Sequence, residues 1–523
     1  MIATSVNGVA LAVFIVLFAL VTGLGFIAVR WRRADLTILN EWGLGGRRFG
    51  SVVTWFLLGG DVYTAYTFIA VPALVYGVGA QGFFALPYTI IVYPLVFVLM
   101  PRLWAVCQRH GYVTPADFVK GRYGSSSLGL ATAFTGLLAT MPYIALQLVG
   151  LRVVIEAMGI TGDWPLIIAF VILAAYTYQS GLRAPALISI VKDTLIYVTI
   201  LVAVIYIPYK LGGYGKIFDA AGGALPHKTG PTGKPGALIP GNDAAYGAYA
   251  TLALGSALAL FMYPHVITGV LSSKSANVIR RNAAVLPAYT FLLGLVALLG
   301  YMAIAAGIKA SSPNAVVPDL FVKYFPSWFE GFAFAAIAIG ALVPAAIMSI
   351  AAANLFTRNI YLEYLRPGCS DREQSQVAKI TSLFVKAGAL AFIVFLPTKY
   401  AIDLQLLGGV WILQTLPAIV FGLFTRWLDR WALLVGWAAG MVTGTLMAID
   451  QDFKSAVYDL HIFGTTVTAY EAIFALALNL VVSVALTAAL RIVGARRAPD
   501  ETVSDDYEEL GEVGAEPAHT VPA

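Results

Sequence analysis

The chain has 523 residues, of which 59% are hydrophobic and only 12% are charged. Soluble domains carry about 25% charged residues, so this composition excludes a soluble globule and favours a protein that lies in lipid. The net charge of +5 needs no nucleic acid partner, because Lys and Arg collect on the cytoplasmic face of membrane proteins, where they contact anionic lipid.

Thirteen apolar runs are long enough to cross a bilayer, which takes about 20 residues in a helix. The first run lacks a basic start and is followed by Arg30, Arg32 and Arg33, which favours a retained span over a signal peptide. The expected spans are residues 8–29, 51–77, 82–105, 128–156, 165–180, 185–209, 246–271, 283–308, 329–357, 377–397, 404–425, 431–449 and 467–493.

The distribution of positive charge predicts the orientation. An external N-terminus and an internal C-terminus place most of the 33 Lys and Arg residues in cytoplasmic loops and the C-terminal tail. The two cysteines, Cys107 and Cys369, have no partners at metal-binding spacing, and we expect neither a metal centre nor a disulfide.

Spans 2 and 7 are both interrupted by Gly or Pro, and each would open a unit of five spans, which is the pattern of an inverted repeat. We expect the first span and a basic loop, repeat 1 (spans 2 to 6), an external loop, repeat 2 (spans 7 to 11), spans 12 and 13, and a disordered acidic tail. The corresponding boundaries are residues 1–45, 46–211, 212–245, 246–426, 427–495 and 496–523.

Each repeat begins with an interrupted apolar run. Span 2 contains Leu58–Thr64 with two glycines and then Pro72, and span 7 contains Tyr263, Pro264 and His265. Gly or Pro breaks at matching positions of two repeats indicate a binding site at mid-membrane. We therefore predict that these two breaks meet around a solute.

Ionisable residues inside the spans are functional candidates, because charge at bilayer depth is costly. Asp61 lies in the first break, either as a cap for the broken helix or as a cation ligand. His265 follows Pro264 and is placed to hydrogen-bond an anion or to relay a proton. Lys192 and Asp193 point about 100° apart on a helix, so we expect each to find its partner in another span or in headgroup water.

Uncharged polar residues form two further sets. Tyr143 and Gln147 lie four residues apart on one face of span 4. Trp411 and Gln414 lie in span 11, near Gln405 and Thr415. Such groups either orient a small solute or hydrogen-bond between helices.

The run from Ala345 to Asn354, continuing through Thr357–Tyr361, resembles the signature of the sodium:solute symporters. The resemblance extends to Pro72–Gly77, Gly181–Ala184 and Gln414–Pro417. It implies an all-α membrane protein with the LeuT-like 5+5 inverted repeat.

The resemblance also implies a sodium site. Ala346 matches the position that supplies a carbonyl and Ser349 the first of two hydroxyls, whereas Ile350 stands where the second hydroxyl is usual. Gly60 and Tyr63 would add backbone oxygens from the broken span 2, and Thr64 falls where the family often has a serine. Because one ligand is missing, coupling to protons through Asp61, Asp193 or His265 is the alternative to sodium coupling.

Within the family, the segments Gly60–Phe68, Tyr263–His265 and Ser349–Asn354 most resemble the monocarboxylate uptake permeases. The implied function is cation-coupled import of a small organic solute such as lactate or pyruvate, by a monomer in the inner membrane that needs no cofactor beyond Na⁺ or H⁺. The alternatives are an amino acid such as proline or alanine, a neutral solute, or a passive channel. An enzyme is disfavoured, since we find no nucleophile motif and no phosphate-binding loop. The predicted solute ligands are Asp61, Thr64, Tyr143, Gln147, Tyr263, His265, Trp411 and Gln414.

Overall fold

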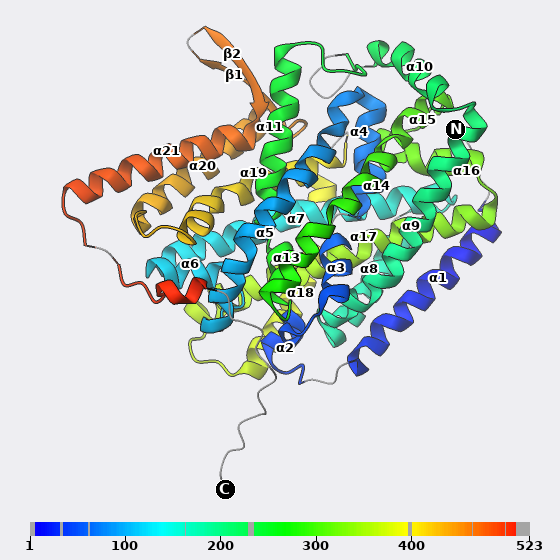
Figure 1. The fold of residues 1–523 in the computed structure, drawn as a ribbon. Helices are drawn as coiled ribbons and strands as arrows, with labels where there is room; N and C mark the ends of the chain where they lie inside the picture. The colour runs from blue at the N-terminus through cyan, green and yellow to red at the C-terminus, as the bar shows by residue number, and fades with distance from the viewer. Residues whose placement is uncertain are drawn as a thin grey trace.

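The computed structural model is a bundle of helices with one small β-hairpin (Figure 1). It describes residues 6–31, 35–60, 63–162, 164–228, 235–395, 400–462, 464–496 and 498–508. The α-helices are α1 (Gly8–Ile27), α2 (Leu39–Leu44), α3 (Ser51–Gly60), α4 (Val71–Val78), α5 (Ala85–His110), α6 (Pro115–Tyr123), α7 (Ser126–Ala157), α8 (Trp164–Ser180), α9 (Arg183–Leu211), α10 (Tyr214–Ala224), α11 (Asp243–Leu260), α12 (Pro264–Leu271), α13 (Ala276–Val285), α14 (Pro287–Ala297), α15 (Leu299–Ala305), α16 (Val316–Tyr324), α17 (Ser327–Phe356), α18 (Asp371–Phe395), α19 (Ile402–Ile412), α20 (Arg430–Asp450) and α21 (Glu471–Ile492). The strands are β1 (Val457–Ile462) and β2 (Thr465–Tyr470), and π-helical turns cover Tyr66–Ala70, Thr357–Leu365 and Pro417–Phe421.

Helical segments lie over each of the thirteen apolar runs. Among the described residues, nine helices are long and apolar enough to cross a membrane, or ten if the bent pair α11 and α12 counts as one span. Large apolar side chains are exposed on outer helices, for example Val16 on α1 and Val171 on α8. Such surfaces are suited to lipid. The helical class is therefore confirmed, while the number of crossings and the orientation stay predictions.

Helix α17 forms the centre of the bundle and is buried along nearly its whole length. It packs against α1, α7 and α9. Its small residues permit this close packing, since a Cβ on Gly331 would lie 2.2 Å from the backbone oxygen of Ala10. Of the interrupted helices, α12 packs against α17, and α3 packs against α9.

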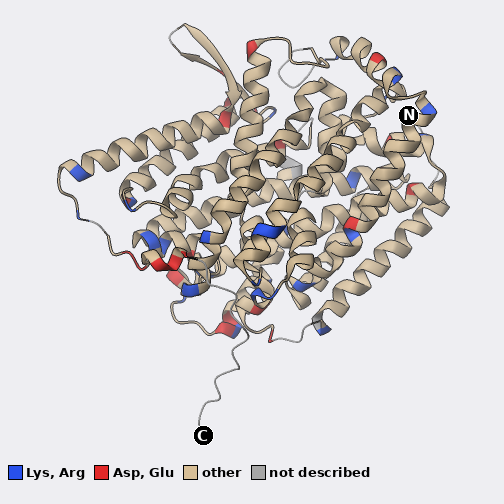
Figure 2. Ribbon diagram, viewed as in Figure 1, with Lys and Arg blue, Asp and Glu red and all other residues tan. Residues whose placement is uncertain are grey.

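The two ends of the bundle differ in charge. Figure 2 shows few charged residues along the helices and a concentration at the end that holds α2 and α6, opposite the β-hairpin. Arg47, Arg122 and Arg426 lie at this end and bind carbonyls or carboxylates there. We call it the basic end, and the opposite one the hairpin end.

Residues 498–508, the C-terminal segment, differ from the disordered tail that the sequence suggested. Arg122 donates a hydrogen bond to Asp500 at 2.5 Å, and Tyr112 donates one to Glu501 at 3.1 Å. The backbone N–H of Glu501 also donates to Gly121 O at 3.0 Å. The acidic composition indicated disorder, but the basic end supplies the partners that order this segment. Residues 509–523 lie outside the described residues.

Two other boundaries differ from expectation. The expected last span began at residue 467, but residues up to Tyr470 belong to β2, which pairs antiparallel with β1. Thr466, Val467 and Thr468 are β-branched residues that favour a strand, and the helix begins only at Glu471. The expected external loop 212–245 contains the helix α10.

Candidate functional site

The two expected helix breaks are confirmed. Helix α3 ends at Gly60, and helical structure resumes as a π-helical turn at Tyr66. A Cβ on Gly59 would lie 2.4 Å from the ring of Tyr289, so the packing there requires glycine. Helices α11 and α12 are bent by 46° at their break. Tyr263 adopts an extended backbone there, as a residue before proline prefers.

An aromatic cluster joins the second break to α7. The ring centroids of Tyr143 and Tyr263 lie 5.2 Å apart, and His265 lies 5.4 Å from the first and 5.3 Å from the second. All three side chains are almost completely buried. Three residues predicted to bind solute, from both expected repeats, therefore come together. We call Tyr143, Tyr263 and His265 the histidine cluster.

Neither ring nitrogen of His265 has a hydrogen-bond partner within the part of the chain that the structure describes. Tyr263, by contrast, donates its hydroxyl to Gln405 O at 2.9 Å. A buried polar group without a partner costs about 1–3 kcal/mol. The imidazole of His265 thus has unused hydrogen-bonding capacity at the start of α12.

The first break is joined to the same face of α7 through Gln147. Its side-chain oxygen accepts a hydrogen bond from the backbone N–H of Ala65 at 3.1 Å, and its amide nitrogen lies 3.5 Å from the hydroxyl of Thr64. The amide also lies 3.5 Å from Tyr143 O. Helix α7 therefore connects both breaks through Gln147 and Tyr143, one turn apart.

Trp411 and Gln414 have partners on the last two helices. Trp411 donates its indole N–H to Thr445 on α20 at 3.0 Å. Asn479 on α21 donates to both side-chain and backbone oxygens of Gln414, at 3.1 and 2.9 Å. These bonds link α19 and the turn Leu413–Thr415 that follows it to α20 and α21, and a contact of either residue with solute stays a prediction.

Lys192 and Asp193 contradict the expectation that they do not pair. The Lys192 ammonium lies 2.9 Å from Asp193 Oδ1, and both side chains are completely buried. The helical offset applies to the Cβ directions, whereas the long lysine side chain bends toward the neighbouring carboxylate. The other carboxylate oxygen of Asp193 accepts a hydrogen bond from Tyr289 at 2.9 Å.

The residues expected to bind a cation have partners of their own. Lys192 donates to the backbone oxygens of Gly60 at 2.7 Å and Tyr63 at 3.0 Å. Ser349 donates its hydroxyl to Ala346 O at 2.8 Å, within α17. Among the described residues, no hydrogen bond or ion pair joins Gly60 or Tyr63 to Ala346 or Ser349. The sodium site stays a prediction, and Asp61 lies outside the described residues.

A cavity of about 360 Å³ opens at the hairpin end, between α4, α11 and α19. Asp403 lines it and is 7% exposed, and one carboxylate oxygen has no hydrogen-bond partner among the described residues. Phe84, also in the wall, packs 6.3 Å from Tyr88, which contacts Tyr66 edge-on at 6.0 Å. Phe84 thus connects the cavity wall to the buried rings of Tyr88 and Tyr66. Asp403 is not among the predicted site residues, although a charge one residue before the expected span 404–425 was a signal.

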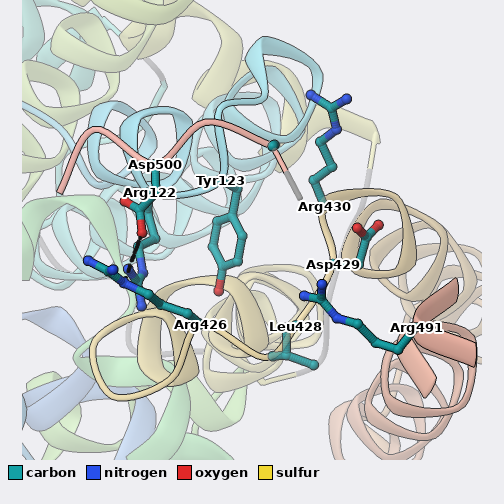
Figure 3. A pocket seen from close by; sticks show the side chains of 9 residues that line it. Arg122, Tyr123, Arg426, Leu428, Asp429, Arg430, Arg491 and Asp500 are labelled. Carbon is teal, nitrogen blue, oxygen red and sulfur yellow. Dashed lines mark hydrogen bonds and ion pairs between the residues drawn. The ribbon is translucent and has the colours of Figure 1, made fainter. Parts of the chain in front are cut away.

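A smaller pocket of about 150 Å³ lies at the basic end. Figure 3 shows Arg122 and Arg426 turned toward Asp500, with Arg430 and Arg491 on the other side. Arg426 lies 3.2 Å from Asp500. None of the lining residues belongs to the histidine cluster, and the pocket marks where the C-terminal segment docks.

Comparison with known proteins agrees with this architecture. The sequence model that describes the sodium:solute symporter family matches residues 42–440. The chain belongs to the sodium:solute symporter family. It is 59% identical over 488 residues to a monocarboxylate transport permease protein of Rhizobium johnstonii, a match that covers 93% of this chain and 98% of the relative. It is 34% identical over 454 residues to an uncharacterised symporter of Bacillus subtilis, with 85% and 89% covered.

A solved structure shares the fold of this symporter. A Na⁺-coupled sialic acid symporter in its substrate-bound, outward-open state aligns with a TM-score of 0.71 at 15% identity, over 92% of this chain and 98% of that one. The LeuT-like architecture is therefore confirmed. Together with the family match and the apolar helices, it identifies the chain as a multi-pass solute symporter of the plasma membrane.

Proposed function

We propose that this symporter imports a small monocarboxylate such as lactate or pyruvate together with a cation, and that its basic end faces the cytoplasm. Positive charge retained at one end of the bundle supports this orientation. The 59% identical relative is named as a monocarboxylate permease. The two helix breaks, joined by α7, supply the place for the solute.

The observation that carries the proposal is the unpartnered imidazole of His265 at the start of α12. The first backbone N–H groups of a helix point out of its N-terminus and carry partial positive charge, which favours an anion. A neutral imidazole adds one N–H donor beside them. A carboxylate bound there would accept these bonds without needing an arginine. The rings of Tyr143 and Tyr263 would then contact the short apolar part of a monocarboxylate.

The size of the cluster favours a small acid. Tyr143 and Tyr263 flank His265 at ring distances near 5 Å, so a compact solute requires less rearrangement than a bulky one. A zwitterionic amino acid would need a further acceptor for its ammonium group. We propose that Thr64 and Gln147 contact the solute on the side away from His265. Their side chains already lie within hydrogen-bonding distance of each other at the first break.

The coupling cation is either sodium or a proton. The family and the Na⁺-coupled structural relative favour sodium, whereas Ile350 leaves the expected sodium site one hydroxyl short. We propose transport without chemical conversion of the solute, so that the compound recovered inside vesicles is the compound added outside.

Uptake by the purified protein in proteoliposomes tests the function. Labelled lactate is added under an imposed sodium gradient and, separately, under an imposed proton gradient, with protein-free liposomes as the control. We expect accumulation above the external concentration under at least one gradient, with competition by pyruvate and propionate. Equilibration without accumulation would instead indicate a channel, and competition only by proline or alanine would indicate an amino-acid symporter.

A further inference from the structure

The ammonium group of Lys192 lies at the end of the broken helix α3. Among the described residues, three oxygen atoms are within 3.0 Å of its nitrogen: the backbone oxygens of Gly60 and Tyr63 and one carboxylate oxygen of Asp193. The side chain is completely buried. In the part of the chain that the structure describes, the ammonium therefore has three oxygen partners, and its side chain is shielded from bulk water.

These carbonyls are suited to a cation. The C-terminal end of a helix carries partial negative charge, and transporters of this architecture use the ends of half-helices and unwound backbone carbonyls to hold coupling cations. Gly60 is the last residue of α3, and Tyr63 lies within the break. Lys192 thus places a positive charge where the fold offers oxygens to a cation.

The surrounding residues hold this arrangement in place. Tyr289 on α14 donates to Asp193, and Tyr63 donates its own hydroxyl to Tyr289 O at 2.7 Å. A Cβ on Gly60 would lie 2.8 Å from the Lys192 nitrogen, so any larger residue at position 60 would clash with the ammonium. The Lys192–Asp193 pair on α9 is therefore bonded to α3 through Gly60 and to α14 through Tyr289.

We propose that the Lys192 ammonium is a tethered cation that binds the Gly60 and Tyr63 carbonyls in place of a sodium ion. A coupling sodium ion, if the protein uses one, binds elsewhere, and these two carbonyls are removed from its ligand set. Lys192 is also not a ligand for the solute carboxylate, because its partners are the three protein oxygens. A test by lactate uptake rests on the proposed function, whereas a test by cation binding to the purified protein does not.

Chemical rescue distinguishes a tethered cation from a merely structural lysine. Lys192→Ala removes the ammonium and leaves a cavity beside the carbonyls, whereas Lys192→Met removes the charge but fills the space. Lys386→Met is the matched control, since Lys386 is also a buried lysine of an expected span, on α18. Methylammonium and sodium are the probes, each tested in otherwise sodium-free choline buffer.

The first readout needs no solute. Thermal unfolding of the purified full-length protein in detergent is measured as a function of probe concentration. We expect a saturable rise in the melting temperature of Lys192→Ala with methylammonium or sodium. Wild type, Lys192→Met and Lys386→Met should lack this additional rise. Equal responses in wild type and Lys192→Ala, or no response of Lys192→Ala to either probe, would overturn the proposal.

The second readout is lactate uptake. Lys192→Ala should lose about tenfold or more of its rate in choline buffer, equivalent to about 1.4 kcal/mol, and regain part of it with the same probe that stabilises it. Lys192→Met should lose uptake without rescue. If wild type accumulates lactate under neither an imposed sodium gradient nor an imposed proton gradient, the proposed function fails, while the thermal readout still decides the role of Lys192.

A comparison of Lys192→Arg with Lys192→Met tests the proposal even if Lys192→Ala does not fold. Lys192→Arg keeps a tethered cation and should retain more sodium-free uptake and a higher melting temperature than Lys192→Met. Equal loss of both properties in the arginine and methionine variants would contradict a role for the charge.

Discussion

The side-chain oxygen of Gln147 accepts a hydrogen bond from the backbone N–H of Ala65, 3.1 Å away, just after the break that follows α3. This bond ties the first break to the α7 face that also carries Tyr143. A chain that leaves its helical path exposes backbone donors, which must find partners inside a membrane. Gln147 supplies one of them and thereby positions the break.

Replacing Gln147 with leucine should impair uptake, because it leaves the Ala65 N–H without its acceptor. We expect a cost of about 1–3 kcal/mol, seen as a lower melting temperature and slower maximal lactate uptake. Gln147→Glu keeps an acceptor and should retain more activity. Gln108→Leu, at an exposed position of α5, is the control. A rise in the half-saturating lactate concentration alone would instead make Gln147 a direct solute ligand.

Substitution of His265 tests the carboxylate contact. His265→Ala should raise the half-saturating lactate concentration by about tenfold or more, as expected for the loss of a charge-assisted hydrogen bond worth about 1.5–3 kcal/mol. The truncation also leaves a cavity beside the rings of Tyr143 and Tyr263, so we expect a lower melting temperature as well, and the half-saturating concentration is the readout for the carboxylate contact. His461→Ala in the exposed hairpin is the matched histidine control. Lactate affinity equal to that of wild type would exclude His265 from the site.

The sequence predicted the histidine cluster because both of its features are local. Pro264 prevents Tyr263 from staying helical, and Tyr143 lies on the α7 face of Gln147. The sequence did not predict that Trp411 and Gln414 bond to α20 and α21, since a helical pattern does not say which neighbour each face meets.

Two errors arose from treating side chains and segments in isolation. The Lys192–Asp193 pair was missed because a helical offset fixes the Cβ direction and not the reach of a lysine. The C-terminal segment was expected to be disordered from its charge alone. Its partners, such as Arg122 and His110, are distant in sequence, and only the fold brings them near.

Ser349→Ala tests the expected cation site on α17. The hydroxyl is buried and donates to Ala346 O, so an arriving cation would bind both oxygens only if the hydroxyl turned its lone pairs inward. If Ser349 is a ligand, its loss should raise the cation concentration for half-maximal uptake by several-fold, about 1 kcal/mol. Ser189→Ala, a buried serine on α9 that donates to its own helix, is the control. An unchanged cation dependence would remove Ser349 from the site.

The docked C-terminal segment should respond to acid through Asp506. Its partial burial acts to raise the pKa, but the hydrogen bonds with His110 and the Val503 N–H, and the charge of Arg109, hold the pKa of Asp506 below its usual value. Because the pKa is lower in the docked state, the carboxylate stabilises docking fully above about pH 3.9, and this contribution is lost as the pH falls through the lowered pKa.

A spin label at the exposed position Glu508 reports this release. Its mobility should rise in wild type as the pH falls below about 3.9. In Asp506→Asn the label should be more mobile at the higher pH, and the change on acidification should be smaller, because the carboxylate that bonds to His110 and to the Val503 N–H is absent. Identical acid responses of the two proteins would show that the segment is held by the contacts with Arg122 and Tyr112 and not by Asp506.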